Sequence, residues 1–77
     1  KENNKYGVKN DSVEKYLKIA DDFEFSNNIR NQYNKKALSF VDLEKKDTTT
    51  MWYIYRMSRN AATIKDSLCY KLVSKHQ

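Results

Sequence analysis

The sequence contains no proline and a single glycine among its 77 residues. Sandwiches and barrels of β-strands need many tight turns, and those turns depend on glycine and proline. One glycine is also too few for the glycine-rich loops that cradle nucleotide phosphates. Asparagine, aspartate and serine remain to make the turns, and these residues are good N-caps of helices. The shortage of glycine and proline therefore predicts an all-α domain.

Cysteine and histidine each occur once. The lone Cys69 cannot form an internal disulfide, which argues against a disulfide-stapled secreted fold and indicates a reducing, cytoplasmic location. One cysteine and one histidine cannot build an ordinary structural zinc site. His76 is the second-last residue of the sequence, and such a position rarely holds a general base rigidly. We therefore expect no enzymatic activity, no metal and no cofactor.

Long apolar runs are also missing, since none approaches the roughly 18 residues that cross a bilayer, and no signal peptide is visible. The length of 77 residues allows one small domain with a thin core. Six tyrosines, three phenylalanines and one tryptophan can fill such a core. Because the sequence begins with Lys1 and not with methionine, an upstream anchor stays open, and membrane association stays open with it.

Apolar residues recur at helical spacing along most of the chain. Residues 1–10 are polar, and we expect them to form an arm or the end of a truncated helix. A single helical domain is then expected over residues 11–77. Asp11 is the predicted cap of its first helix, because Glu14 follows three positions later in a capping-box spacing. This helix is expected to fray near Phe23, where acidic residues oppose the helix dipole.

Three further helix starts are predicted at Ser26, Ser39 and Asp47. Ser26 precedes Ile29 and Tyr33, which are spaced to share one apolar face. Ser39 has the spacing of a hydrophobic staple and predicts a short third helix. After Asp47, the pattern fits either one helix over 48–74 or two helices that divide near Ser58–Asn60, and we expect the division. The sequence thus predicts a small bundle of four to five short helices, with a helix-turn-helix as one form of it.

Lysine and arginine outnumber aspartate and glutamate by 15 to 10. Such a surplus is typical of domains that neutralise nucleic-acid phosphates or bind anionic surfaces. Arg56 and Arg59 are three positions apart, so they share a helix face and could straddle a phosphate. A solvated helix face is the competing interpretation. The basic residues expected to contact phosphates are Lys5, Lys9, Lys15, Lys18, Arg56, Arg59 and Lys65.

The segment Met51–Met57 reads MWYIYRM and is apolar on most sides of a helix. A domain of this size can bury only part of such a segment. It therefore contributes to the core, to a surface for self-association or a partner protein, or to both. Stacking on single-stranded bases is a third interpretation. The residues expected at an interface are Trp52, Tyr53, Tyr55 and Met57.

Residues 5–20, KYGVKNDSVEKYLKIA, resemble the turn and recognition helix of the helix-turn-helix in ParB-type partition proteins. Gly7–Val8 resembles the turn of that family, Ser12–Val13 the helix start, and Tyr16–Ala20 its Tyr-Leu-Arg/Lys-Leu-Ala run. Lys36–Phe40 resembles the start of a later helix, so the likeness covers residues 5–43. It departs from the family at Glu14, which would repel phosphate on the recognition face.

The resemblance implies a role in replication, partition or transcription of a plasmid, phage or chromosome. A dimer is expected on separate grounds, because small basic DNA-binding domains are often dimers. The resemblance also implies that one helix contacts the major groove or its phosphates. Asn10 and Lys15 would then contact base edges. The residues implied to face DNA are Lys9, Asn10, Ser12, Lys15 and Lys18.

The leading hypothesis is a module that binds double-stranded DNA through its phosphate backbone. The alternative is a helical module for protein interaction or oligomerisation that uses residues 51–57. DNA and a second copy of the chain are the expected partners, and no small-molecule substrate is expected. Convergence of Lys9, Lys15, Arg56 and Arg59 on one face would favour DNA, whereas an exposed patch at Trp52 or Tyr53 would favour the interaction module.

Overall fold

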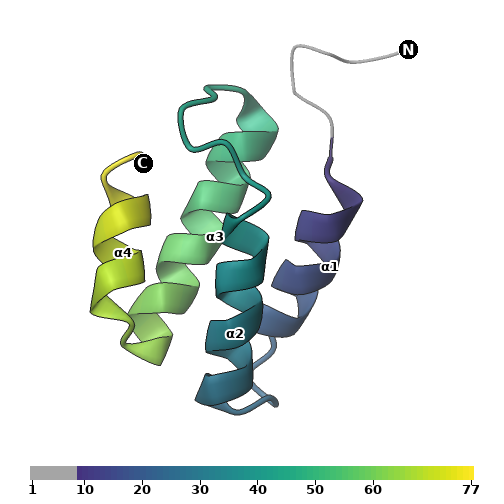
Figure 1. The fold of residues 1–77 in the computed structure, drawn as a ribbon, viewed down its shortest axis with the longest axis vertical. Helices are drawn as coiled ribbons and strands as arrows, with labels where there is room; N and C mark the ends of the chain where they lie inside the picture. The colour runs from purple at the N-terminus through teal and green to yellow at the C-terminus, as the bar shows by residue number, and fades with distance from the viewer. Residues whose placement is uncertain (1–8) are drawn as a thin grey trace.

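A computed structural model describes residues 9–77 of the chain and contains four helices in that range (Figure 1). They are α1 (Asp11–Ala20), α2 (Asn27–Leu38), α3 (Thr48–Ile64) and α4 (Ser67–Ser74). Residues 9–77 include no strand, so the prediction of a small all-α fold is confirmed. Lys5 and most of the predicted arm over 1–10 lie outside the described residues.

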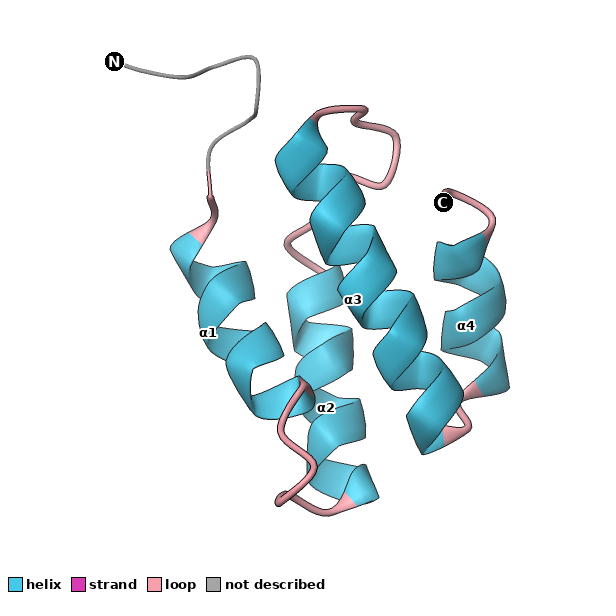
Figure 2. Ribbon diagram, turned by 180° about the vertical axis from the view of Figure 1, so that it is seen from behind, coloured by secondary structure: helices cyan, strands magenta, loops and turns pink. Residues whose placement is uncertain are grey.

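The helices pack in chain order across the molecule, with α1 and α4 at opposite sides (Figure 1). α1 packs on α2, α2 on α3 and α3 on α4, and α1 also touches α3. α3 is the longest helix and lies in front of α2 when the molecule is seen from behind (Figure 2). One side of α3 therefore packs on the other helices, and its opposite side faces outward.

The core is built mainly from apolar side chains of α1, α3 and α4. Leu17, Ile54, Met57 and Val73 are fully buried, and alanines allow close helix contacts between them. Burying such side chains is worth about 1.5–3 kcal/mol each. α2 contributes only Ala37 to the buried apolar side chains, and its other buried residues, Arg30 and Asn34, are polar.

The buried face of α2 is polar apart from Ala37, and of the two residues predicted to form its apolar face only Tyr33 packs against the core. Arg30 and Asn34 are buried together with Ala37, whereas Ile29 is exposed and Tyr33 is half-buried. Arg30 donates to the carbonyl of Ala20 and Asn34 to the carbonyl of Met57, so these buried polar side chains keep hydrogen-bond partners. The spacing of Ile29 and Tyr33 alone could not reveal this.

Side-chain caps begin every helix, as the shortage of glycine and proline predicted. Ser26 and Asp47 are confirmed as N-caps, with Oγ and Oδ1 accepting from the N–H groups of Ile29 and Thr50 at 3.2 and 2.7 Å. The first cap is Asn10 and not Asp11. Asp11 was predicted because it has the capping-box spacing to Glu14. The side chain of Asn10 instead accepts from the free N–H groups of Ser12 and Val13. α1 also ends at Ala20, before Phe23.

The predicted third helix after Ser39 does not form. Ser39 instead ends α2, where its N–H donates to the carbonyls of Lys35 and Lys36. Residues 36–40 therefore end a helix, although they resemble the start of one in the ParB-type family. Downstream, Asp42 Oδ1 accepts from the N–H of Glu44 at 3.0 Å, which is a turn and not a helix cap.

Two helices follow Asp47, but they divide at Lys65 and not near Ser58–Asn60. Ser58 and Asn60 are buried within α3. Lys65 has φ 68° and ψ 37°, a left-handed conformation that closes α3. The N–H of Asp66 then donates to the carbonyl of Ala61 at 2.9 Å, and the Asp66 carboxylate caps α4. This closing geometry is the Schellman pattern, which glycine usually supplies.

Replacing Lys65 by glycine should stabilise the protein, because a β-carbon in the left-handed region costs about 1 kcal/mol. We expect Lys65→Gly to raise the free energy of unfolding by about 0.5–1 kcal/mol. Lys65→Ala removes the same charge but keeps the β-carbon, and should stay within about 0.5 kcal/mol of the wild type. Urea denaturation followed by circular dichroism measures both values. A glycine variant less stable than the alanine variant would contradict the assignment.

Candidate functional site

The guanidinium of Arg56 lies between two carboxylates of α1. Its Nε and Nη2 donate to Asp21 Oδ2 at 2.9 and 2.7 Å, and its Nη1 lies 3.4 Å from Glu14 Oε1. The side chain of Arg56 is largely buried in this position. Charge-assisted contacts of this kind are stronger than ordinary hydrogen bonds. Arg56 therefore joins α3 to α1, and its predicted role as a free phosphate contact is not supported by this geometry.

Asp21 is shared by three side chains of α3. Its Oδ1 accepts from Asn60 Nδ2 at 2.7 Å and lies 3.5 Å from Arg59 Nη2, while Oδ2 accepts from Arg56. Asp21 is also the C-cap of α1. The acidic charge of Asp21 thus lies where α1 meets the arginines of α3. The predicted basic residues of the two helices do not form one uninterrupted positive face.

Arg30 of α2 also binds the C-terminal end of α1. Its Nε donates to the carbonyl of Ala20 at 2.8 Å, and its Nη2 donates to Thr63 Oγ1 at 3.0 Å. Burial lowers the pKa of the Arg30 guanidinium, and the negative charge of Asp21 offsets part of this effect by raising it. A cation at the C-terminus of a helix satisfies free carbonyls and the helix dipole. Sequence reasoning missed Arg30, because its partners lie far away in the chain.

Three of the predicted DNA contacts are exposed on α1 or just before it. Lys9, Lys15 and Lys18 point into solvent. Asn10 uses Oδ1 to accept from the N–H groups of Ser12 and Val13 at 2.9 and 3.2 Å. The Asn10 carboxamide oxygen is therefore occupied by the helix cap, and the half-buried Ser12 belongs to the same cap.

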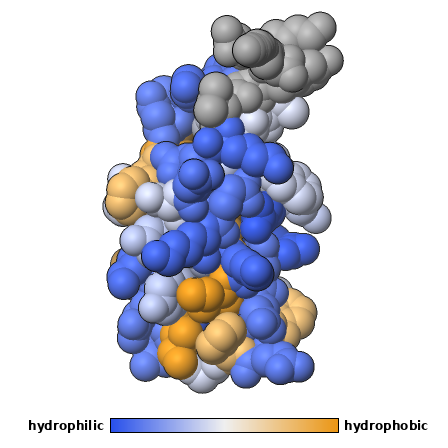
Figure 3. Space-filling view, turned by 90° about the vertical axis from the view of Figure 1, so that its right-hand side faces the viewer, coloured by the Kyte–Doolittle hydropathy of each residue, from blue (hydrophilic) through white to orange (hydrophobic). Residues whose placement is uncertain are grey.

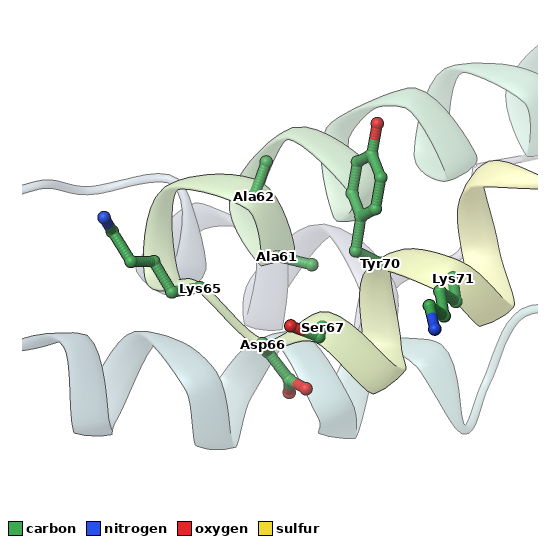
Figure 4. Close-up of a pocket in the computed structure, with 7 residues that line it drawn as sticks. All are labelled: Ala61, Ala62, Lys65, Asp66, Ser67, Tyr70 and Lys71. Atoms are coloured by element: carbon green, nitrogen blue, oxygen red, sulfur yellow. The ribbon is translucent and has the colours of Figure 1, made fainter.

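Lys65 lies at the far end of α3, beside a hollow of about 400 Å³ between α3 and α4. Ala61, Tyr70 and Lys71 line the same hollow, and the Lys65 side chain extends away from Tyr70 (Figure 4). The two lysines do not converge on a common point in this view. The hollow therefore resembles an open depression more than a ligand site.

The predicted interface residues divide into two pairs. Tyr53 and Met57 are 3% and 0% exposed, so they belong to the core and cannot line a surface of the folded chain. The Tyr53 hydroxyl donates to Glu14 Oε2 at 2.8 Å and accepts from the N–H of Asn10 at 3.0 Å. Burial raises the pKa of this phenol. Tyr53 thereby positions the start of α1.

Trp52 and Tyr55 form the exposed pair, at 52% and 45% of their full surface. Their rings are stacked, with centroids 5.5 Å apart and planes 20° apart. The Arg56 guanidinium carbon lies 5.9 Å from the centre of the Trp52 ring. A cation within about 6 Å of an indole face is attracted to it. Trp52 is thus held on the surface by two neighbours on its own helix.

The lone cysteine lies beside Asp66, whose Oδ1 accepts from the Cys69 N–H at 3.2 Å. Cys69 is buried, and this burial is the main cause that raises the pKa of its thiol. The negative charge of Asp66 raises the same pKa further. A protonated buried thiol is a poor nucleophile. Within residues 9–77, no group of three or more His, Cys, Asp and Glu side chains is placed to hold a metal ion. None of the helices in this range combines the length and apolar character needed to cross a membrane.

Replacing Asp21 by asparagine should destabilise the fold, because Arg56 would lose its carboxylate while remaining largely buried. We expect Asp21→Asn to lower the free energy of unfolding by about 1–3 kcal/mol. Asp22→Asn is the matched control one position later: Asp22 is exposed, and the change should cost less than about 0.5 kcal/mol. Thermal and urea denaturation give both values. Equal effects at the two positions would show that the Asp21 contacts contribute nothing.

Comparisons with known proteins give no family for this chain: no protein-family model, no curated protein and no solved structure matches it significantly. The likeness of residues 5–43 to ParB-type proteins therefore stays a prediction. The function has to be argued from the two features described above, the ion-paired end of α1 and the exposed aromatic pair of α3.

Proposed function

We propose that this chain is a non-catalytic helical interaction module that binds a partner protein through the outward side of α3. The observation that carries the proposal is the exposed stacked pair of Trp52 and Tyr55. Tryptophan, tyrosine and arginine dominate the binding energy of protein interfaces. An exposed apolar patch on the surface of a small domain is typical of an interaction site.

The outward side of α3 presents these residues in one line. Thr48, Trp52, Tyr55, Arg59 and Ala62 are all exposed, and their spacings of four and three residues place them on one helix face. No other helix lies in front of α3 in the view of Figure 2. A face of this kind suits a flat or concave partner surface.

The aromatic pair is also preorganised. Tyr55 stacks on Trp52 from one side, and Arg56 lies near the indole while Asp21 holds its guanidinium in place. Side chains that are already ordered lose little entropy on binding. The partner that fits this face has an apolar pocket for the indole, with a carboxylate nearby for the half-exposed Arg59.

The test is affinity capture from a lysate of the source organism, followed by reconstitution with the purified captured protein. Trp52→Ala should weaken the reconstituted complex by about thirtyfold or more, the size of a typical hot-spot loss. Lys15→Ala on α1 is the control and should leave the affinity unchanged. The emission of Trp52, the single tryptophan, should shift to shorter wavelength on binding. A complex that is insensitive to Trp52→Ala would refute the role of α3.

Binding of double-stranded DNA is the second candidate, and the exposure of Lys9, Lys15 and Lys18 on the outer side of α1 favours it. The net charge of +5 adds general attraction to phosphates. Glu14 and Asp21 lie on the inner edge of the same helix, beside Arg56. A DNA contact would therefore be limited to the outer side of α1, with a small number of phosphates.

Fluorescence anisotropy of a labelled random duplex tests this candidate across a salt series. The logarithm of affinity should fall linearly with the logarithm of salt, by about 0.9 per phosphate contacted. Lys15→Ala should reduce that slope by about one contact. Arg56→Ala should leave the slope unchanged, because that guanidinium is engaged by carboxylates. Absence of binding at low salt would exclude this candidate for residues 1–77.

A further inference from the structure

The connection between α3 and α4 is short and strained. Only Lys65 and Asp66 lie between the two helices. Within residues 9–77, Lys65 is the one non-glycine residue with a positive φ, and a β-carbon is sterically disfavoured in that region. Residues 48–74 contain neither glycine nor proline, so the backbone can also run through the connection as one straight helix. The α3–α4 hairpin is therefore one of two available forms.

The contacts that hold α4 on the bundle are few, and they do not depend on which chain supplies the helix. α4 packs on α3, and Cys69 and Val73 are its buried side chains. Just after α4, Gln77 Oε1 accepts from the Ser58 hydroxyl of α3 at 2.9 Å. A second copy of the chain carries the same α4, so its α4 can make every one of these contacts.

Two leucines of α4 have no place in the core of the hairpin. Leu68 is 82% exposed and Leu72 is 43% exposed. From Ala61 through Ile64 to these leucines, the spacings of 3, 4 and 4 residues are those of one helix face. Ala61 is fully buried, so a straight helix would continue the buried face of α3 through both leucines. Their spacing fits the straight form, and the hairpin leaves them in solvent.

The end of α3 lies at an apolar end of the molecule. Arg30 donates to Thr63 Oγ1 near the end of α3 at 3.0 Å, and its guanidinium carbon lies 4.4 Å from the centre of the Phe23 ring. The space-filling view of the α1 side shows an apolar area at the end where α1 and α2 connect (Figure 3). A straight helix would carry Leu68 about 6 Å beyond the last residue of α3. A straightened α3 would therefore bring a second copy to this end.

We propose that two copies of the chain exchange α4 and form a domain-swapped dimer. In this dimer α3 and α4 of each copy are one straight helix, and α4 of each copy packs on α3 of the other. Each chain gives up the left-handed turn at Lys65 and keeps the buried contacts of Cys69 and Val73. Leu68 and Leu72 then lie where the two bundles meet. The exchange is reciprocal and closes at two copies, and short connections under strain favour it.

Substitutions at the connection test the exchange. Glycine is relaxed in the left-handed turn and disfavoured inside a helix. Because each dimer has two connections, Lys65→Gly should weaken dimerisation at least about a hundredfold. Lys65→Ala removes the same charge, keeps the β-carbon and favours a helix, so it should dimerise at least as well as the wild type. Sedimentation velocity at concentrations up to about 1 mM measures both, and the wild-type mass should rise to that of two copies and no further.

The distance between two points of one chain distinguishes exchange from side-by-side association. Spin labels on Arg59→Cys and Lys75→Cys, with Cys69→Ala to remove the native thiol, report the separation of α3 from α4. Excess unlabelled protein leaves one labelled chain in each dimer. The labels are close in the hairpin, since Ser58 contacts Gln77, whereas the labelled positions would lie about 24 Å apart in a straight helix. The longer distance should grow with the fraction of dimer.

Trp52→Ala should form the same dimer, because Trp52 lies in the first half of α3 and the connection follows its end. This variant separates the exchange from the proposed function of α3. The proposal is overturned by a wild type that stays monomeric to about 1 mM, by a dimer whose labels stay close, or by a dimer that is lost in Trp52→Ala. Equal dimerisation of Lys65→Gly and Lys65→Ala would overturn it as well.

Discussion

The carboxylate of Asp21 joins the end of α1 to the middle of α3, and the positions of Arg56 and Arg59 depend on this contact. It receives Arg56, Asn60 and Arg59 from one helix, while Arg30 holds the adjacent carbonyl of Ala20 from another. Three of the four helices therefore meet at one short stretch of backbone. A carboxylate shared in this way is hard to replace, because the largely buried Arg56 and the buried Asn60 would each lose their shortest hydrogen bond.

This contact also explains why a basic sequence does not make a uniformly basic surface. The net charge of +5 counts every arginine equally, but Arg56 and Arg30 are used inside the fold. The cations that remain outside are mainly lysines, which lie on several sides of the molecule. Net charge therefore predicts general attraction to anions, and only the positions of the side chains show where a specific partner could bind.

The sequence was sufficient where local chemistry decides the structure. The helical class, the caps at Ser26 and Asp47, and the apolar face of Val13 and Leu17 follow from spacing and from residues a few positions apart. It was insufficient where distant residues decide. The role of Arg56 depends on Asp21, 35 positions away, and the burial of Asn34 depends on the backbone of Met57. Ser39 is not an N-cap because it is the C-cap of α2, where its N–H donates to carbonyls of the preceding turn.

The left-handed residue Lys65 has a consequence for the cooperativity of unfolding. α4 is joined to the bundle through this single closing turn and buries only Cys69 and Val73. A short helix with so few buried contacts is expected to open before the rest of the domain does. Leu68 and Leu72 of α4 face Leu38 of α2 across a groove of about 330 Å³, so any occupant of that groove would bind only the form in which α4 is packed on the bundle. Occupancy would then be coupled by mass action to the local stability of the last helix.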